Sequence, residues 1–127
     1  MPFKFGPQSK KNLLGVHPDL VRVMELAISR SELDFGISEG LRTKARQKML
    51  VAAEASTTMN SRHLTGHAVD VFPVIKGRAQ WDYPLFTKLS VVIKAAAKEL
   101  GVPIEWGGDW KTFKDGPHFQ LPRKQYP

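Results

Sequence analysis

The stretch SRHLTGHAVDVFPV, residues 61–74, contains the clearest structural transition in the sequence. Its second half, from Ala68 to Val74, is rich in apolar and β-branched residues, which is typical of a strand. Gly66 predicts a turn just before this strand. Because side chains alternate along a strand, Asp70 lies on one face, and Val69 and Val71 lie on the other. The stretch therefore predicts a turn, then a strand with one apolar face and one face that carries a carboxylate.

Hydrophobic spacing predicts helices on both sides of this stretch. Apolar residues recur three and four apart over residues 18–30 and over residues 84–100, which indicates two amphipathic helices. Gly101 and Pro103 would end the second of them. Short strands are expected at 35–37, 104–106 and 118–121, with a turn-rich loop at 107–117. This order predicts an α+β fold, with helices packed on a small antiparallel sheet.

A further helix is expected after Thr43, whose hydroxyl suits a helix cap. It would run to about Ala55, with Met49, Leu50 and Ala53 directed inward. The alternating cations in this region would spread around such a helix and favour a solvated surface over a dedicated groove for nucleic acid.

Composition limits the classes of protein and site that fit. The 127 residues, 42% of them hydrophobic, fit one globular domain spanning residues 1–127. There are no cysteines, so any metal must be held by His and carboxylate side chains. The net charge of +7 favours polyanionic partners but does not choose among nucleic acid, anionic lipid and cell wall.

Two segments carry the residue types of a hydrolytic metal site. In the first, the turn can fold His63 back beside Asp70, a carboxylate that is costly to bury without a partner. In the second, His118 opens a strand and Asp115 precedes it on a Gly-Pro turn. Two His and one Asp could hold a catalytic metal with an open position, and a further carboxylate could move protons.

Spacing alone leaves other interpretations open. A single His at the end of an element is often only a polar residue, and Asp70 could be an ordinary buried partner of Arg42 or Ser61. His67 lies four residues after His63, which would place both on one face of a helix. Gly66 disfavours a helix there, so His67 is not expected to be a metal ligand. Gln120 receives no catalytic role.

These segments resemble a known family. Ser61-x-His63-x-x-Gly66-x-Ala68-x-Asp70 and Asp115-x-x-His118 are similar to the two metal-binding motifs of the D-alanyl-D-alanine carboxypeptidase-like zinc peptidases. The segments GVHPDL (15–20), SEGLRT (38–43), WGGDW (106–110) and PHFQL (117–121) resemble the phage L-alanyl-D-glutamate endopeptidases within that family. The resemblance runs from about Leu14 to Leu121.

The resemblance implies a fold and a set of residue roles. The fold would be Hedgehog/D-Ala-D-Ala peptidase-like, with the zinc site on the sheet. One Zn²⁺ would be held by His63, Asp70 and His118. Asp115 would act as acid and base, and Arg42 would bind the substrate and stabilise its carbonyl oxygen. Further substrate contacts are expected from three residues, Ser61, His67 and Trp110.

The implied activity is hydrolysis of the bond between L-alanine and D-glutamate in peptidoglycan stem peptides, by a phage or prophage lysis enzyme. The alternatives are a D,D-carboxypeptidase or dipeptidase that releases D-alanine, and a non-catalytic wall-binding module stabilised by zinc. Residues 1–11 lack the pattern of a signal peptide, and no apolar run is long enough to span a bilayer. We therefore expect a monomer, without membrane insertion or a nucleic-acid partner. It would stay in the host cytoplasm until a separate pore, a holin, gives it access to the periplasm and cell wall.

Overall fold

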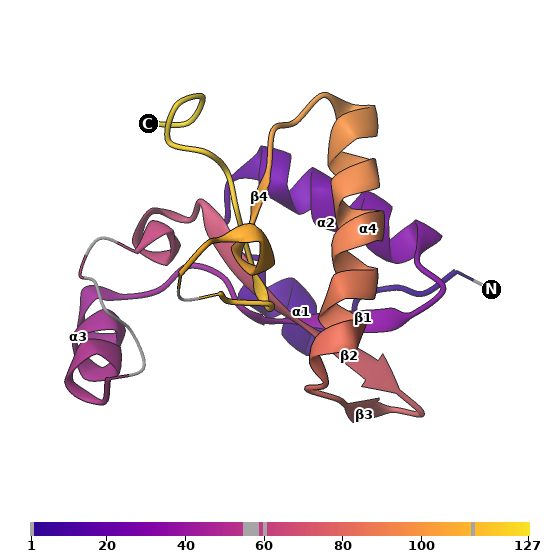
Figure 1. Ribbon diagram of the computed structural model, residues 1–127, viewed down its shortest axis with the longest axis horizontal. Helices are drawn as coiled ribbons and strands as arrows, with labels where there is room; N and C mark the ends of the chain where they lie inside the picture. The colour runs from indigo at the N-terminus through magenta and orange to yellow at the C-terminus, as the bar shows by residue number, and fades with distance from the viewer. Residues whose placement is uncertain (1, 55–58, 60, 113) are drawn as a thin grey trace.

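The computed structural model describes residues 2–54, 59, 61–112 and 114–127, and its helices and strands are interspersed along the chain (Figure 1). The elements in chain order are α1 (Pro7–Asn12), α2 (Pro18–Arg30), β1 (Asp34–Glu39), α3 (Lys44–Ala52), η1 (Arg62–Thr65), β2 (Ala68–Ile75), β3 (Arg78–Ala79), α4 (Tyr83–Leu100), β4 (Glu105–Trp106), η2 (Gly107–Asp109) and β5 (His118–Gln120). The mixture of helices and one small sheet confirms the predicted α+β class.

The strands form one antiparallel sheet around β2. β1 and β5 flank β2, β4 pairs with β5, and the short β3 pairs with the far end of β2. The register places Asp70 of β2 opposite both Glu39 of β1 and His118 of β5. Because directly opposed residues share a face, these three side chains form a polar row across one face of the sheet.

The other face of the sheet carries the hydrophobic core. Val69 and Val71 of β2 and Phe119 of β5 are fully buried on this face. The helices α2 and α4 pack against each other, and α4 also contacts β2 (Figure 1). The alternation predicted around Asp70 is therefore confirmed: Val69 and Val71 enter the core, and Asp70 lies on the face that remains for a site.

The two amphipathic helices are confirmed. All the apolar residues that define the predicted inner stripe of α2 are buried, and His17 caps this helix by accepting a hydrogen bond from the Asp19 N–H. The helix α4 ends at Gly101, whose φ of 70° is the left-handed conformation that favours glycine. No helix within the described ranges is both long and apolar enough to cross a membrane.

The helix α3 confirms one prediction and corrects another. Thr43 caps it, since its Oγ1 accepts a hydrogen bond from the Arg46 N–H. The predicted inward residues are wrong: Met49 and Ala53 are exposed, and Leu50 is only half-buried. The buried residue is instead Gln47. The reason is visible in Figure 1, where α3 lies apart from α2 and α4, so its inner side meets the polar site instead of the core.

Some short elements were not predicted. These are the helix α1 and the strand β3, which span six and two residues. Their sequences are too short or too polar to show a hydrophobic period, and both residues of β3 are exposed. The predicted end of α3 near Ala55 lies outside the described residues.

Candidate metal centre

His63 is positioned by the turn η1. The Ser61 side chain caps this turn and accepts a hydrogen bond from the His63 N–H at 3.2 Å. Gly66 ends the turn with a φ of 75°, and a Cβ there would lie 2.4 Å from the carbonyl oxygen of Gly15. The predicted turn is thus a single 3-10 turn that leads directly into β2 and directs the His63 ring toward Asp70.

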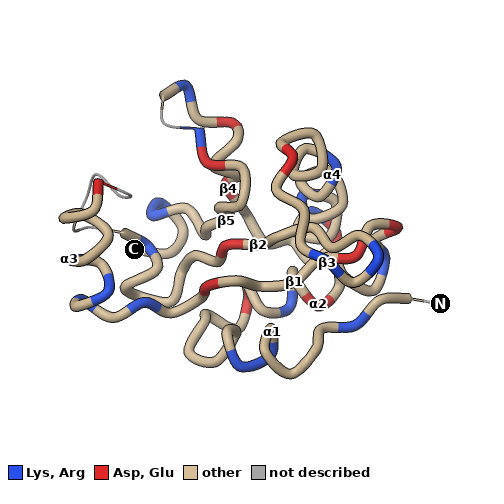
Figure 2. Tube along the Cα trace, turned by 90° about the horizontal axis from the view of Figure 1, so that it is seen from below, with Lys and Arg blue, Asp and Glu red and all other residues tan. Residues whose placement is uncertain are grey.

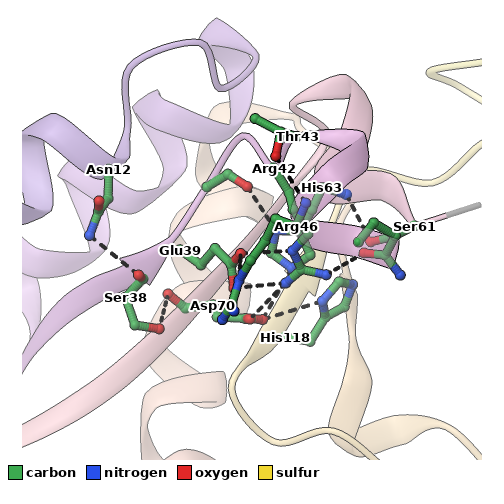
Figure 3. Close-up of polar contacts among 12 residues, drawn as sticks. Asn12, Ser38, Glu39, Arg42, Thr43, Arg46, Ser61, His63, Asp70 and His118 are labelled. Carbon is green, nitrogen blue, oxygen red and sulfur yellow. Dashed lines mark hydrogen bonds and ion pairs between the residues drawn. The ribbon is translucent and has the colours of Figure 1, made fainter. Parts of the chain in front are cut away.

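The side chains of His63, Asp70 and the distant His118 converge on the polar face of the sheet (Figure 3). The Oδ1 atom of Asp70 lies 3.3 Å from Nε2 of His63 and 3.4 Å from Nδ1 of His118. All three potential ligand atoms lie within 4.8 Å of one another. The sequence predicted this convergence, and the register between β2 and β5 brings it about.

In each histidine ring, the nitrogen that points away from Asp70 makes a hydrogen bond that fixes the tautomer of the ring. His63 Nδ1 lies 2.9 Å from the carbonyl oxygen of Gly40, so this nitrogen carries the proton and donates it. His118 Nε2 in the same way donates to Oε1 of Gln120 at 2.7 Å, and the amide nitrogen of Gln120 donates to Glu105. The two remaining ring nitrogens therefore direct lone pairs at Asp70.

This arrangement requires a positive charge between the side chains. The Nε2 atom of His63 and the Oδ1 atom of Asp70 are buried and find no hydrogen-bond partner among the residues that the structure describes. Two acceptors that face each other at 3.3 Å are unfavourable unless a proton or a cation lies between them. Two imidazole nitrogens and one carboxylate oxygen match the donor set of a catalytic zinc ion, so the residues present fit a metal.

The charges in the group shift the pKa values of its members. Burial favours the neutral form of Asp70, but the close contacts with His118 and His63 outweigh burial and hold its pKa well below the usual range. Burial alone would lower the pKa of His118, yet the contact with Asp70 raises it. The site thus attracts positive charge, which a metal ion would supply more strongly than a proton.

Arg42 lies beside Asp70 and is held firmly. Its side chain is 8% exposed, and it donates two hydrogen bonds to the Glu39 carboxylate, at 2.7 and 2.8 Å, and one to Gln47 at 2.8 Å. Its Nη2 atom lies 3.7 Å from Oδ2 of Asp70. A guanidinium has five N–H donors, so these three bonds leave one donor on each terminal nitrogen for a substrate.

Asp115 sits on the loop that leads into β5. Its main-chain N–H donates to Gly107 at 3.0 Å, and its carbonyl accepts from the His118 N–H at 3.2 Å. Gly107 has no room for a Cβ, which would lie 2.3 Å from the Asp115 carbonyl oxygen. The surrounding protein, and next the negative charge of Asp70, raise the pKa of the Asp115 carboxyl. The residue remains exposed at the opening of the site.

A family model described as phage L-alanyl-D-glutamate peptidase matches residues 1–121 of this chain. The chain belongs to the phage L-alanyl-D-glutamate peptidase family. The L-alanyl-D-glutamate peptidase of Escherichia phage T5 is 36% identical over 130 residues, which cover 99% of this chain and 94% of that protein. The L-alanyl-D-glutamate peptidase of Listeria phage A118 is 40% identical over 109 residues, 79% of this chain and 37% of that protein.

A solved structure from a related enzyme has the same fold as this chain. The crystal structure of the Serratia marcescens L-Ala D-Glu endopeptidase ChiX matches it with a TM-score of 0.94 and 51% sequence identity. The match covers 99% of this chain and 95% of that one. The family resemblance expected from the sequence motifs is therefore confirmed, as is the fold that it implied.

Of the other residues predicted for the site, Trp110 lies beside a member of the metal group and His67 has other neighbours. The Trp110 ring is 5.2 Å from the His118 ring, measured between centroids. His67 is not among the three converging residues: its Nδ1 lies 2.7 Å from Oγ1 of Thr65, and its ring faces His17 at 5.6 Å. Asp109 accepts a bond from Lys94. The substrate roles of Ser61, His67 and Trp110 stay predictions.

Trp106 packs in the core. It is 7% exposed, stacks on Phe119 and donates its indole N–H to the carbonyl of Gly116 at 2.7 Å. This packing anchors the loop that carries Asp115.

Sequence reasoning missed three groups that orient this family member's site: the Gly40 carbonyl, the Gln47 side chain and the Gln120 side chain. A main-chain carbonyl leaves no signal in a sequence. Gln120, in contrast, lies two residues after His118 on a predicted strand, so the two side chains share a face. The spacing of two residues was therefore sufficient to predict contact between the His118 and Gln120 side chains.

Proposed function

We propose that this chain is a zinc-dependent peptidase that hydrolyses the L-alanyl-D-glutamate bond of peptidoglycan stem peptides, with residues 1–127 forming one catalytic domain. The observation that carries the proposal is a pair of buried atoms, His63 Nε2 and Asp70 Oδ1, which have no hydrogen-bond partner within the described part of the chain and lie close to Nδ1 of His118. Membership of the phage L-alanyl-D-glutamate peptidase family supports the choice of bond.

His63, Asp70 and His118 would hold the ion with their three converging atoms. A zinc ion bound by three protein ligands acts as a Lewis acid and lowers the pKa of a bound water to about 7. Three ligands also leave a coordination position open, which distinguishes a catalytic from a closed structural site.

Asp115 would carry protons between the water and the leaving group. Its carboxylate accepts a proton from the attacking water and then donates it to the departing amine of D-glutamate. The raised pKa of Asp115 suits both steps, because its carboxyl holds the proton more readily than that of an Asp surrounded only by water.

Arg42 would donate a hydrogen bond to the carbonyl oxygen of the scissile bond, where negative charge develops. The Glu39 and Gln47 contacts hold the guanidinium in place before substrate binds. Such preorganised donors stabilise the transition state more than flexible ones, because no reorganisation is needed during the reaction. In the same proposal Ser61, His67 and Trp110 contact the rest of the substrate.

Purified peptidoglycan and metal analysis test this proposal. Chelator should abolish hydrolysis, zinc should restore it, and new N-terminal D-glutamate should appear by mass spectrometry. His63→Ala should lose bound zinc, whereas His67→Ala should retain one ion per chain. Release of D-alanine without new D-glutamate termini would support the carboxypeptidase alternative. Tight zinc binding without any hydrolysis would support a binding module. The monomeric state, the separate pore and the cellular location stay predictions.

A further inference from the structure

Aromatic side chains continue the polar face of the sheet beyond the metal group. Phe72 follows Asp70 by two residues on β2, and side chains at this spacing share a face and lie about 7 Å apart. The partner of Phe72 on β1 is Gly36, where a Cβ would lie 2.6 Å from the tip of the Phe72 ring. Because Gly36 has no side chain, the ring can lie across β1. The aromatic surface therefore begins where the metal group ends.

Trp81 extends this surface. It lies shortly after β3, and its ring is 5.9 Å from the Phe72 ring and 6.0 Å from the Phe86 ring, with interplanar angles of 31° and 34°. Phe86 is buried in the first part of α4, which lies beside β2 and β3 (Figure 1). Trp81 is thus held between two rings, yet 60% of it is exposed. Most of the indole stays available to a ligand.

The same surface adjoins the loop that carries Asp115. A Cβ at Gly116, the next residue, would lie 3.3 Å from Cβ of Phe86, the ring partner of Trp81. The loop then continues into His118 at the start of β5. The Trp81 ring is therefore linked to the metal group by two routes, along β2 and along this loop. A substrate at the metal group can reach Trp81 without leaving this side of the sheet.

The chemistry of peptidoglycan places a sugar close to the scissile bond. The amino group of L-alanine is joined to the lactyl group of an N-acetylated sugar. One amino acid and one short linker therefore separate that sugar from the carbonyl group that would lie at the metal. Two residue lengths of extended chain span about 7 Å. This is the separation of Phe72 from Asp70 along β2, so the sugar would lie at the aromatic surface.

We propose that Phe72 and Trp81 form a platform on which this sugar stacks. The proposal rests on the proposed function. A pyranose ring presents a face of C–H groups, and an aromatic ring offers a flat apolar surface against which such a face packs. An exposed apolar patch of this kind typically marks an interaction site. The platform would favour stem peptides that are still attached to glycan over stem peptides that have been released from it.

A second copy of the chain fits this surface less well. Lys76 and Arg78 are exposed on the turn and strand that precede Trp81, and Figure 2 shows blue segments close to β3. These two cations outnumber the neighbouring Asp82. Two copies that met through Trp81 would bring like charges together, which is unfavourable. The sugar brings no such charge, since its lactyl carboxyl is consumed in the amide bond to L-alanine.

The test compares two stem peptides that begin with L-alanyl-D-glutamate. One carries a lactyl group alone on the L-alanine nitrogen and the other carries N-acetylmuramic acid, so that they differ only in the sugar. The wild type should cleave the sugar-bearing peptide with about five- to tenfold higher kcat/KM, mainly through KM. Trp81→Ala should bring the ratio of the two kcat/KM values close to one, by slowing cleavage of the sugar-bearing peptide. Trp81→Phe keeps a ring and should give an intermediate ratio.

Val91→Ala is the matched control. Val91 is 68% exposed on α4, so its truncation also removes exposed apolar surface, and it should leave the wild-type ratio unchanged. A wild-type ratio in Trp81→Ala would overturn the platform. So would equal slowing of both substrates by that variant, which would place the peptide, and not the sugar, on the ring.

Two further outcomes are decisive. Sedimentation that shows a dimeric wild type and a monomeric Trp81→Ala would assign the surface to a second copy and overturn the proposal. Equal cleavage of both substrates by the wild type, a result that needs no variant, refutes the platform alone. Cleavage of neither substrate refutes the proposed function, and the platform with it.

Discussion

The hydrogen bond between His118 and Gln120 should control the affinity of the site for zinc. Gln120 Oε1 accepts from His118 Nε2 at 2.7 Å, and Glu105 accepts from the amide nitrogen of Gln120 at 3.3 Å. The Glu105 contact orients the amide so that its oxygen, and not its nitrogen, meets the imidazole. The ring is thereby fixed with Nδ1 free to bind the metal.

The expected magnitude follows from burial and bond type. Removing the partner of a metal-bound histidine typically costs 10- to 100-fold in affinity. His118 is 6% exposed, so its N–H would lose a partner in a largely dry position, at a cost of about 1–3 kcal/mol. Gln120 is itself half-buried, so water can replace part of the bond. Gln120→Ala should therefore weaken zinc binding about tenfold, or about 1.4 kcal/mol.

Competition with a chromophoric chelator measures this change directly on the purified protein. Gln120→Glu keeps an acceptor for the ring and should recover most of the affinity, although its charge lies close to Glu105. Gln125→Ala is the matched control, because it removes the same side chain at an exposed position. Zinc affinity equal to wild type in Gln120→Ala would refute the reasoning, since the ring would then be oriented without this bond.

Three further perturbations test the chemistry and the fold. Asp115→Asn should retain zinc but hydrolyse peptidoglycan about 10²- to 10⁴-fold more slowly, and near-normal turnover would remove its proton-transfer role. Leu89→Ala, at a fully buried position, should lower the free energy of unfolding by about 2–5 kcal/mol in urea. Tyr126→Phe should cost about 0.5–1 kcal/mol, because the Tyr126 hydroxyl donates to Asp19 at 2.6 Å. That bond lowers the pKa of Asp19 and raises that of Tyr126, so the cost should be full between about pH 4 and pH 10. It should diminish in acid as Asp19 is protonated and in alkali as Tyr126 ionises; a difference that does not vary with pH would contradict the assignment.

The sequence was sufficient for the parts of the fold that depend on local pattern. The stripe in α2 and the alternation in β2 are long enough to show their period, and Thr43 and Gly101 mark helix ends by their own chemistry. The failure at α3 has a physical cause. Which side of α3 faces inward depends on its neighbours. The buried residue is Gln47, which accepts a hydrogen bond from Arg42, and a search for hydrophobic spacing cannot identify a buried polar residue.

The metal group was accessible from the sequence for a different reason. His63 and Asp70 lie on one local unit, a turn and the strand that follows it, so short-range geometry brings them together. His118 depends on the pairing of β2 with β5, which spacing along the chain does not specify. The family motif supplied that long-range information.

The register of β2 explains why one carboxylate can serve the whole site. Asp70 is the residue that opposes both Glu39 and His118, so its two oxygens face different neighbours: Oδ1 the two histidines, and Oδ2 the Arg42 that Glu39 holds. A shift of one residue in either pairing would turn Asp70 toward the core and Val69 or Val71 toward the site. The fully buried valines on the opposite face resist that shift, because each would have to leave the core. Core packing therefore sets the position of the metal ligands, and the stability of this small sheet is a condition for its chemistry.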